Sequence, residues 1–317
     1  MKRVMAALLA TLALPAAAQS YPAKTVRIVV PFPAGGSTDI LARVAAENLN
    51  KSYGQLFIVD NRPGATGTIG GAIVASSVPD GYTLIMHSVS TYIAAFLYRK
   101  ISYDAARAFT PVVNLSVNPF LLVSSAGLPA RTVKELIALA RQHPNQMTFG
   151  TVGNGSGSHL VAEMFNSAAG IKTVSVPYKG SAPVMVAVAS GEVGFTVNNI
   201  LDTRPFVNQG KMRALAVTSA TRSRAAPDVP ALKESGLDVE ANLWTGLFAP
   251  AGTPRAVVNK LNEDLARILD TAQMKDWLLT SLGGEFMPHT PEQFAAFLAT
   301  DTARWQKIAR QINVHLD

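Results

Sequence analysis

The feature that most limits how this chain can fold is a regular alternation of short apolar runs with longer helical runs. VRIVV (26–30) is followed by DILARVAAENL (39–49), and LFIVD (56–60) is followed by a glycine-rich segment and GYTLIMHS (81–88). The short runs are rich in strand-favouring residues, whereas the longer runs repeat their apolar positions at the helical period. This alternation predicts βα units built on a parallel sheet, which is an α/β fold.

The same alternation returns after about residue 120 and predicts a second sheet. Thr132 and Glu135 form a capping box at the start of one helix, and a short helix is expected from Pro183 to Gly191. Two later helices are expected to open at Thr253–Pro254 and Thr290–Pro291, with the threonine as the cap. The expected strands of this half are FLLVSS (120–125), MTFGTV (147–152), TVSVPY (173–178), EVGFTV (192–197) and RALAVTS (213–219).

The first twenty residues have the pattern of a secretory signal peptide. A basic start at Lys2 and Arg3 precedes an apolar stretch and the small-residue exit Ala16–Ala18. A membrane anchor would need about 20 consecutive apolar residues, whereas this run is shorter and ends at Pro15. We therefore expect residues 1–18 to be cleaved and the protein to be exported to the periplasm.

Composition removes several classes of protein from consideration. There is no cysteine, so neither a disulfide nor a lipid-attached cysteine is available, and the 48% hydrophobic residues must supply the core. The net charge is +7, and removal of Lys2 and Arg3 leaves +5 without the basic stripe and interleaved aromatics of a nucleic-acid binder. We expect no metal site, because the histidines show no paired metal spacing; they are His87, His143, His159, His289 and His315. We also expect no tightly bound cofactor.

The first candidate site is FPAGGSTD (32–39), where a strand ends in glycines and a helix begins at Ser37, Thr38 and Asp39. The unpaired N–H groups of such a helix point into the crevice above the strand ends, where anions bind. The alternative is that Ser37 or Asp39 only caps the helix. No lysine follows the glycines, so this is not a nucleotide-binding P-loop.

A second glycine-rich turn, FGTVGNGSGSHLVAEMF (149–165), also leads from a strand into a helix. Ser158 stands where a dinucleotide fingerprint needs its third glycine. A hydrolase nucleophile elbow needs a glycine two residues before the serine, whereas Ser156 has Asn154 there and Ser158 has Ser156. His159 could serve as a base for a neighbouring serine, although a histidine in the first turn of a helix is more often structural.

Three further segments carry weaker signals. VPYKGSAPVM (176–185) offers a lysine and backbone donors to an acidic ligand, or is a surface turn. MHSVST (86–91) places hydroxyl groups at the end of a strand. NRPGATGTIGGA (61–72) could be a phosphate nest, but its glycines favour close helix packing.

Taken together, these segments resemble a known family over essentially the whole mature chain. FPAGGSTD, NRPGATGTIGGAIVASSVPDGYTL, GNGSGSHLVAEMF, VPYKGSAPVM, GKMRALAVTS and GLFAPAGTP occur in family-like order. They are similar to the extracytoplasmic solute receptors of tripartite tricarboxylate transporters, the Bug family. Each motif alone has low specificity, whereas six in order behind a signal peptide are specific.

The resemblance implies a two-lobed periplasmic binding protein, type II-like, with two chain crossovers at the hinge near residues 122 and 247. Lobe 1 would consist of residues 19–122 plus 247–317, and lobe 2 of residues 123–246. It implies a monomeric receptor, not an enzyme, that closes on a small carboxylate and is recognised by the membrane subunits of the transporter. The expected ligand is a di- or tricarboxylate or an aromatic acid.

The resemblance also implies which residues face the ligand. From lobe 1 these are Phe32, Ala34, Gly35, Gly36, Ser37, Thr38, Asp39, Ser88, Ser90 and Thr91. From lobe 2 they are Asn154, Ser156, Ser158, His159, Tyr178, Lys179, Gly180 and Asn198.

Two departures from the family bear on the ligand. Thr91 and Tyr92 replace a common His-Ala pair, and Asn198 stands where relatives commonly carry an aspartate. A neutral Asn198 cannot pair with a ligand ammonium, so we expect a dicarboxylate or aromatic acid rather than an amino acid. Two alternatives stay open: an exported hydrolase or isomerase using Ser156, Ser158 and His159, and a receptor that reports to a sensor kinase.

Overall fold

The computed structural model describes residues 21–98 and 100–311, so the expected signal peptide lies outside the described residues. The strands are β1 (Val26–Val30), β2 (Phe57–Asn61), β3 (Thr83–Ser88), β4 (Phe109–Ser125), β5 (Thr148–Thr151), β6 (Val174–Pro177), β7 (Phe195–Asn199), β8 (Met212–Val217) and β9 (Asn242–Pro250). The helices are α1 (Ser37–Tyr53), α2 (Thr68–Ala75), α3 (Val89–Leu97), α4 (Val133–Gln142), α5 (Gly157–Ala169), α6 (Ser181–Ser190), α7 (Ile200–Asn208), α8 (Arg255–Leu269), α9 (Ala272–Trp277) and α10 (Pro291–Gln311). Short helical turns are η1 (Ala65–Gly67), η2 (Leu232–Ser235) and η3 (Leu278–Leu282). Of the helices within these residues, none is long and apolar enough to cross a membrane.

The two expected sheets are joined through one strand. The strand order is β2-β1-β3-β9-β4-β7-β5-β6, and β8 pairs with β4 off this path. The first part of β4, up to Pro119, pairs with β9, whereas Phe120 onward pairs with β7 and β8. The βα units predicted from the sequence are present, because β1 is parallel to β2 and β3, and β5 is parallel to β6 and β7.

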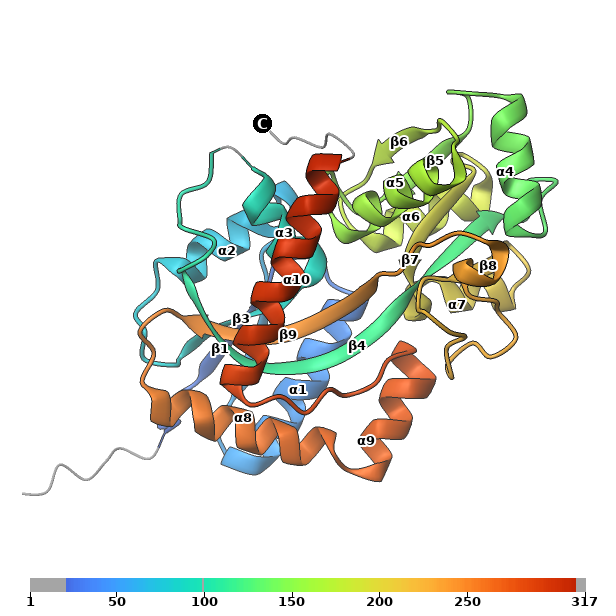
Figure 1. The fold of residues 1–317 in the computed structure, drawn as a ribbon. Coiled ribbons are helices and arrows are strands. Elements are labelled where there is room, and N and C mark those ends of the chain that lie inside the picture. The colour runs from blue at the N-terminus through green and yellow to red at the C-terminus, as the bar shows by residue number, and fades with distance from the viewer. Residues whose placement is uncertain (1–20, 99, 312–317) are drawn as a thin grey trace, which may run out of the picture.

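The strands β4 and β9 connect the two lobes of an α/β fold (Figure 1). Lobe 1 contains β1 to β3 with α1, α2, α3, α8, α9 and α10, and lobe 2 contains β5 to β8 with α4 to α7. On the return path the Ala241 N–H still donates to the Thr218 carbonyl of lobe 2, and the next residue, Asn242, already pairs with Pro119. The hinge positions expected at 122 and 247 lie inside β4 and β9, whose pairing changes at Pro119–Phe120 and at Ala241–Asn242.

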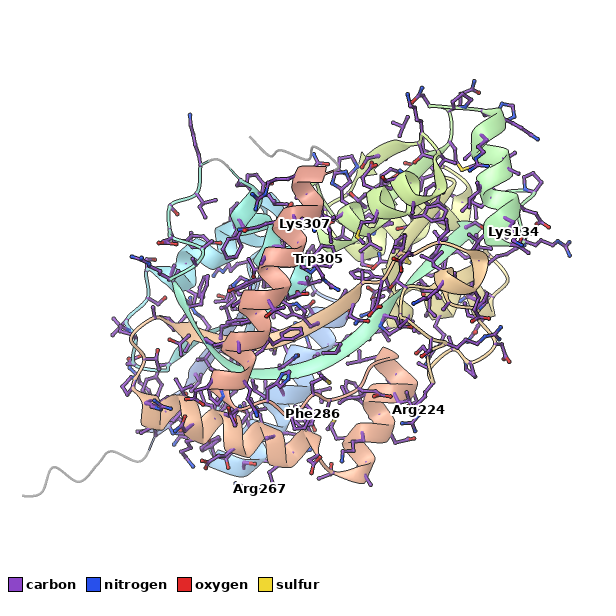
Figure 2. The ribbon with its side chains drawn as sticks, viewed as in Figure 1. Lys134, Arg224, Arg267, Phe286, Trp305 and Lys307 are labelled. Atoms are coloured by element: carbon purple, nitrogen blue, oxygen red, sulfur yellow. The ribbon has the colours of Figure 1, made fainter. Side chains whose placement is uncertain are left out.

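A tryptophan cluster fixes the C-terminal third of the chain to lobe 1. Trp305 of α10, labelled in Figure 2, and Trp244 of β9 are fully buried. Both indole N–H groups donate to Asp301, at 2.9 Å and 2.8 Å. Burial raises the pKa of this carboxyl, and the two indole hydrogen bonds and Arg304 partly offset that effect. Because a buried indole removes about 150–250 Å² of apolar surface from water, this contact is a large part of what holds α10 in place.

The helix starts agree with the sequence in two cases and differ in two. The capping box is confirmed, since the Glu135 N–H donates to the Thr132 hydroxyl, and α10 does begin after Thr290. The cap predicted at Thr253 is wrong: its hydroxyl donates to the Pro250 carbonyl, and α8 begins one residue after Pro254. Helix α6 begins at Ser181 rather than at the predicted Pro183. The N–H groups of a helix's first turn have no partner within the helix, so proline, which lacks an N–H, is tolerated at any position of that turn.

Candidate functional site

A cavity lies between the two lobes at the carboxyl ends of β1 and β3. Its empty space of about 590 Å³ includes solvent at its open mouth. Lobe 1 lines it with Phe32, Pro33, Ala34, Gly36, Ser37, Thr38, Ser88 and Ser90. Lobe 2 and the crossing strands line it with Phe120, Val152, Ser158, Lys179, Gly180, Ser181, Ala182, Pro183, Asn198, Asp202 and Leu243.

The first turn of α1 faces this cavity without a side-chain cap. Gly36 is the N-cap residue, and the first intrahelical hydrogen bond runs from the Ile40 N–H to the Gly36 carbonyl at 3.0 Å. The N–H groups before Ile40 therefore have no partner within the helix. A Cβ atom on Gly36 would meet nothing within 4 Å, so glycine keeps the approach to these donors open. Gly35 has a φ of +92°, which favours glycine at this turn.

The first turn of α6 faces the same cavity from lobe 2. Gly180 is its N-cap, with a φ of +108° and no side-chain cap. A Cβ atom on Gly180 would lie 3.3 Å from Pro33 of lobe 1, so the two loops touch across the cleft. Two uncapped helix N-termini, each carrying a partial positive charge, thus face one cavity from opposite lobes.

Hydroxyl groups supply further donors, and one of them is free. The Ser88 hydroxyl is buried and has no hydrogen-bond partner among the described residues, although Ser88 lines the cavity. The Ser90 hydroxyl, in contrast, accepts a hydrogen bond from the Gly157 N–H of lobe 2 at 3.0 Å. An unpaired buried hydroxyl costs free energy unless a ligand or water pairs with it.

Two charged side chains line the cavity, and only Lys179 was predicted. Asp202 lies in the first turn of α7 and lines the cavity together with Ser37 of α1 and Ser181 of α6. Burial raises the pKa of Asp202 to about 6. Helix α7 was not predicted from the sequence; Asn199 followed three residues later by Asp202 is a helix-start signal that could have found it.

Eleven of the predicted residues line the cavity and seven do not. The eleven are Phe32, Ala34, Gly36, Ser37, Thr38, Ser88, Ser90, Ser158, Lys179, Gly180 and Asn198. The seven are Gly35, Asp39, Thr91, Asn154, Ser156, His159 and Tyr178. Whether any of these eighteen residues binds a ligand stays a prediction.

Asp39 lies next to the cavity, but its carboxylate is bound by other groups of the protein. Its carboxylate accepts hydrogen bonds from the Gly35 N–H and from Arg43 at 2.9 Å, and from Asn61. Burial would raise its pKa, yet these hydrogen bonds, with that of Arg43 first, hold the pKa below the usual range. Asp39 therefore shapes the loop before α1 and does not face the cavity.

The serine and histidine residues at the start of α5 hold that helix end together. The Ser156 hydroxyl accepts a hydrogen bond from the His159 N–H, and His159 Nδ1 accepts one from the Gly155 N–H at 3.1 Å. Burial lowers the pKa of His159 to about 4, so the ring is neutral at pH 7. Ser158 accepts a hydrogen bond from the Val152 N–H at 3.1 Å. These hydrogen bonds agree with the interpretation of His159 as a structural residue.

Thr91 and Tyr178 also have partners outside the cavity. The Thr91 hydroxyl accepts a hydrogen bond from the Ser88 N–H and donates to the Ser88 carbonyl. The Tyr178 hydroxyl donates to Glu192 at 2.6 Å. These contacts close the first turn of α3 and fix the loop before α6.

The glycine-rich segment before and within α2 packs closely, as the sequence favoured. A Cβ atom on Gly70 would lie 2.9 Å from Pro31, and one on Gly71 would lie 2.5 Å from the Tyr103 hydroxyl. The same segment reaches lobe 2, because the Thr66 hydroxyl donates to the Asn154 carbonyl at 3.1 Å. Together with the contact between Pro33 and Gly180, this hydrogen bond brings the lobes together beside the cavity.

A two-lobed α/β fold with two crossing strands and a cavity lined by both lobes defines a solute-binding protein of the periplasmic type. Residues 41–314 match the family described as tripartite tricarboxylate transporter family receptor. The chain belongs to this receptor family, as the resemblance implied.

Relatives and solved structures agree with this assignment. BugT of Bordetella pertussis is 34% identical over 310 residues, which cover 97% of this chain and 95% of BugT. An R. palustris protein solved with adipate superposes with a TM-score of 0.90 at 36% identity, covering 94% of this chain and all of that one. MatC of Rhodopseudomonas palustris, solved with malate, superposes with a TM-score of 0.85 at 33% identity, and the match covers 91% of this chain and 99% of MatC. The periplasmic binding protein BugD superposes with a TM-score of 0.87 at 32% identity, and the match covers 94% of this chain and 100% of BugD.

Proposed function

We propose that this chain is an exported receptor that captures a small dicarboxylate between its lobes and delivers it to the membrane subunits of a tripartite tricarboxylate transporter. One observation carries the proposal: the uncapped N-termini of α1 and α6 face a single cavity from opposite lobes. Each N-terminus offers unpaired N–H donors and a partial positive charge to an anion. Two such ends favour a ligand with a carboxylate at each end.

The other polar groups of the cavity support an anionic ligand. Lys179 adds a cation beside α6, and the free Ser88 hydroxyl adds a donor in lobe 1. Two solved members of similar sequence hold adipate and malate, which are both small dicarboxylates.

An amino acid is a poorer ligand for this cavity than a dicarboxylate, because the side chain of Asn198 is already hydrogen-bonded within lobe 2. Its side-chain N–H donates to the Ser181 hydroxyl at 3.1 Å, and its side-chain oxygen accepts from the Asn199 N–H at 2.8 Å. Both ends of the amide are therefore engaged within lobe 2.

Chemical transformation of the ligand has less support than binding. The most suggestive cluster, Ser156, Ser158 and His159, is engaged in closing the start of α5. A neutral histidine with a pKa near 4 is a weak general base at pH 7. The cluster contributes only Ser158 to the cavity lining.

Capture couples to closure because the ligand would touch both lobes at once. A ligand stabilises the closed state only by the difference in its affinity for the two states. In the closed arrangement α1 of lobe 1 and α6 of lobe 2 face the same cavity, so each ligand carboxylate adds contacts that an open cleft does not offer. The closed receptor is then the form that the membrane subunits recognise.

The test is a calorimetric screen of the mature chain, residues 19–317. Succinate, malate and adipate are compared with benzoate, aspartate and glutamate, and recovered ligand is examined by mass spectrometry. Binding of at least one dicarboxylate, recovered unchanged, is the expected result. Binding of amino acids alone, or recovery of an altered acid, would overturn the proposal.

A further inference from the structure

The loop before α2 has an unusual backbone conformation. The four consecutive residues 64–67 all have positive φ angles, and two of them, Ala65 and Thr66, are not glycines. Thr66 has φ 47° and ψ 37°, which is the left-handed region. A β-branched residue seldom adopts this conformation, and it is kept only where the surrounding structure imposes it. The backbone of Thr66 therefore needs an explanation beyond the local sequence.

Contacts within lobe 1 hold the loop in this conformation. The Thr68 hydroxyl, which is buried, donates to the Ala65 carbonyl at 2.9 Å. A Cβ atom on Gly67 would lie 2.5 Å from Thr91, so the loop packs directly against α3. The residues on either side of Thr66 are thus fixed to lobe 1, and neither contact uses the Thr66 hydroxyl group.

The Thr66 hydroxyl is directed at lobe 2 instead. It donates to the Asn154 carbonyl at 3.1 Å, and a Cβ atom on Gly153 would lie 2.9 Å from the same hydroxyl oxygen. The loop that carries the acceptor is held by α5, because the Gly155 N–H donates to His159 Nδ1 at 3.1 Å. Two loops, each fixed to its own lobe, therefore meet through this hydrogen bond.

The simpler interpretation is that Thr66 is an ordinary loop residue that meets lobe 2 by chance. A loop threonine typically bonds the backbone close to itself in sequence, and Thr68 does so in the same loop. Thr66 instead bonds a residue 88 positions along the chain, from a left-handed backbone that glycine would adopt with less strain. Strain of this kind collects at functional positions, so the contact between the lobes is the better explanation.

Resting on the proposed function, we propose that Thr66 is a positioning residue that keeps the receptor closed on its ligand: its hydroxyl and the Asn154 carbonyl form a latch between the lobes. Both residues lie outside β4 and β9, the strands that join the lobes, so rotation about those strands separates them. Neither residue lines the cavity, so the latch acts on ligand release through closure and not by touching the ligand.

The latch makes a kinetic prediction. The ligand leaves only after the lobes open, so loss of the Thr66 hydroxyl should raise the dissociation rate constant without lowering the association rate constant. The contact is solvent-exposed and uncharged, so the expected increase is roughly three- to tenfold.

The experiment follows lobe opening by energy transfer between two dyes on the mature chain. Val78→Cys in lobe 1 and Lys172→Cys in lobe 2 replace exposed residues, and the sequence has no cysteine of its own, so labelling is specific. The tightest-binding of succinate, malate and adipate is loaded, and its release on dilution is timed by stopped flow. Melting temperatures are measured on the same proteins.

Four variants separate the hydroxyl from the backbone strain. T66V lacks the hydroxyl but keeps the branched shape, T66G lacks it and accepts the left-handed backbone, and T66S keeps it. The matched control is T300V, because the exposed Thr300 hydroxyl donates only to Ala296 of its own helix. T66V and T66G should release the ligand roughly three- to tenfold faster than the wild type. T66S and T300V should stay within about twofold, and T66G should melt no lower than the wild type.

Unchanged release in T66V overturns the proposal. Release in T66S that is as fast as in T66V also overturns it, because the hydroxyl would then not be the group that matters. A lower melting temperature with unchanged release in T66G shows a purely structural role and likewise overturns it.

A ligand-free measurement separates this proposal from the proposed function. If none of the three acids binds the wild type, the proposed function fails. The same dyes then test the latch alone: the population at the short, closed distance should fall at least threefold in T66V and recover in T66S. Equal populations in the wild type and T66V overturn the latch by itself.

Discussion

Replacement of Gly36 by aspartate tests whether the bare start of α1 is the anion site. Gly36 has φ −84° and ψ 169°, which any residue can adopt, and a side chain there meets nothing within 4 Å. An aspartate at this N-cap position can accept hydrogen bonds from the free N–H groups of the first turn. The variant would thus bring its own carboxylate to the place proposed for the ligand, whereas Gly36→Ala adds a methyl group and leaves the donors free.

The aspartate has effects of opposite sign on stability and on binding. An aspartate cap is only a few tenths of a kcal/mol more favourable than glycine, so the melting temperature should stay level or rise by about 1 °C. A second carboxylate about 4 Å away is repelled by about 4 kcal/mol at an effective dielectric constant of 20. Even half of this repulsion, about 2 kcal/mol, weakens binding by roughly 30-fold.

Thermal unfolding without ligand and calorimetry with malate or adipate together measure both effects. G36D should melt at or above the wild-type temperature and lose roughly 30-fold or more in affinity, and G36A should bind within about fivefold of the wild type. G36D that binds as tightly as G36A would show that the α1 N-terminus is not the anion site. Equal loss in both variants would show that a side chain, not a charge, blocks the cavity.

Three further predictions follow from side chains of the cavity and the core. Ser88→Ala should weaken dicarboxylate binding by about 5- to 10-fold without lowering the melting temperature, because the hydroxyl has no partner among the described residues; a drop in stability with unchanged affinity would contradict this. Lys179→Met should cost only about 2- to 5-fold in affinity, since this lysine is solvent-exposed, and the difference should vanish in 0.5 M salt. Burial lowers the pKa of His87 to about 3 and of His159 to about 4, so the unfolded chain, whose histidines titrate near 6.5, binds more protons below that pH. Stability to urea should fall as the pH drops from 7 to 5, by at most about 2 kcal/mol for each residue, and His159→Gln should reduce this slope whereas the exposed His143→Gln should not.

Segments with strong local signals were predicted correctly from the sequence. The apolar runs at 26–30 and 120–125 form β1 and the end of β4, and the capping box at Thr132 marks the start of α4. The class of fold followed from their alternation. These features depend on neighbouring residues alone, which is why they can be read without a structure.

Features that depend on distant contacts were missed. The first part of β4, from Phe109 to Pro119, carries polar residues and two prolines, and it is a strand because β9 pairs with it. Helix α7 contains Pro205 and is short, so its weak pattern hid the one acidic residue that lines the cavity, Asp202. The role of Asp39 depends on its contact with Arg43, and the role of His159 depends on its contact with Gly155. These contacts form only when the loops fold.

The pair of strands that joins the lobes also decides how the receptor can move. β4 and β9 stay hydrogen-bonded to each other up to Pro119 and Asn242, where the two halves separate. A paired ribbon flexes and twists as a unit far more readily than it shears along its length, since sliding would break its ladder of hydrogen bonds. For the proposed receptor we therefore expect opening and closing to approach a single rotation about this ribbon, so that one distance across the cleft would distinguish the loaded from the empty form.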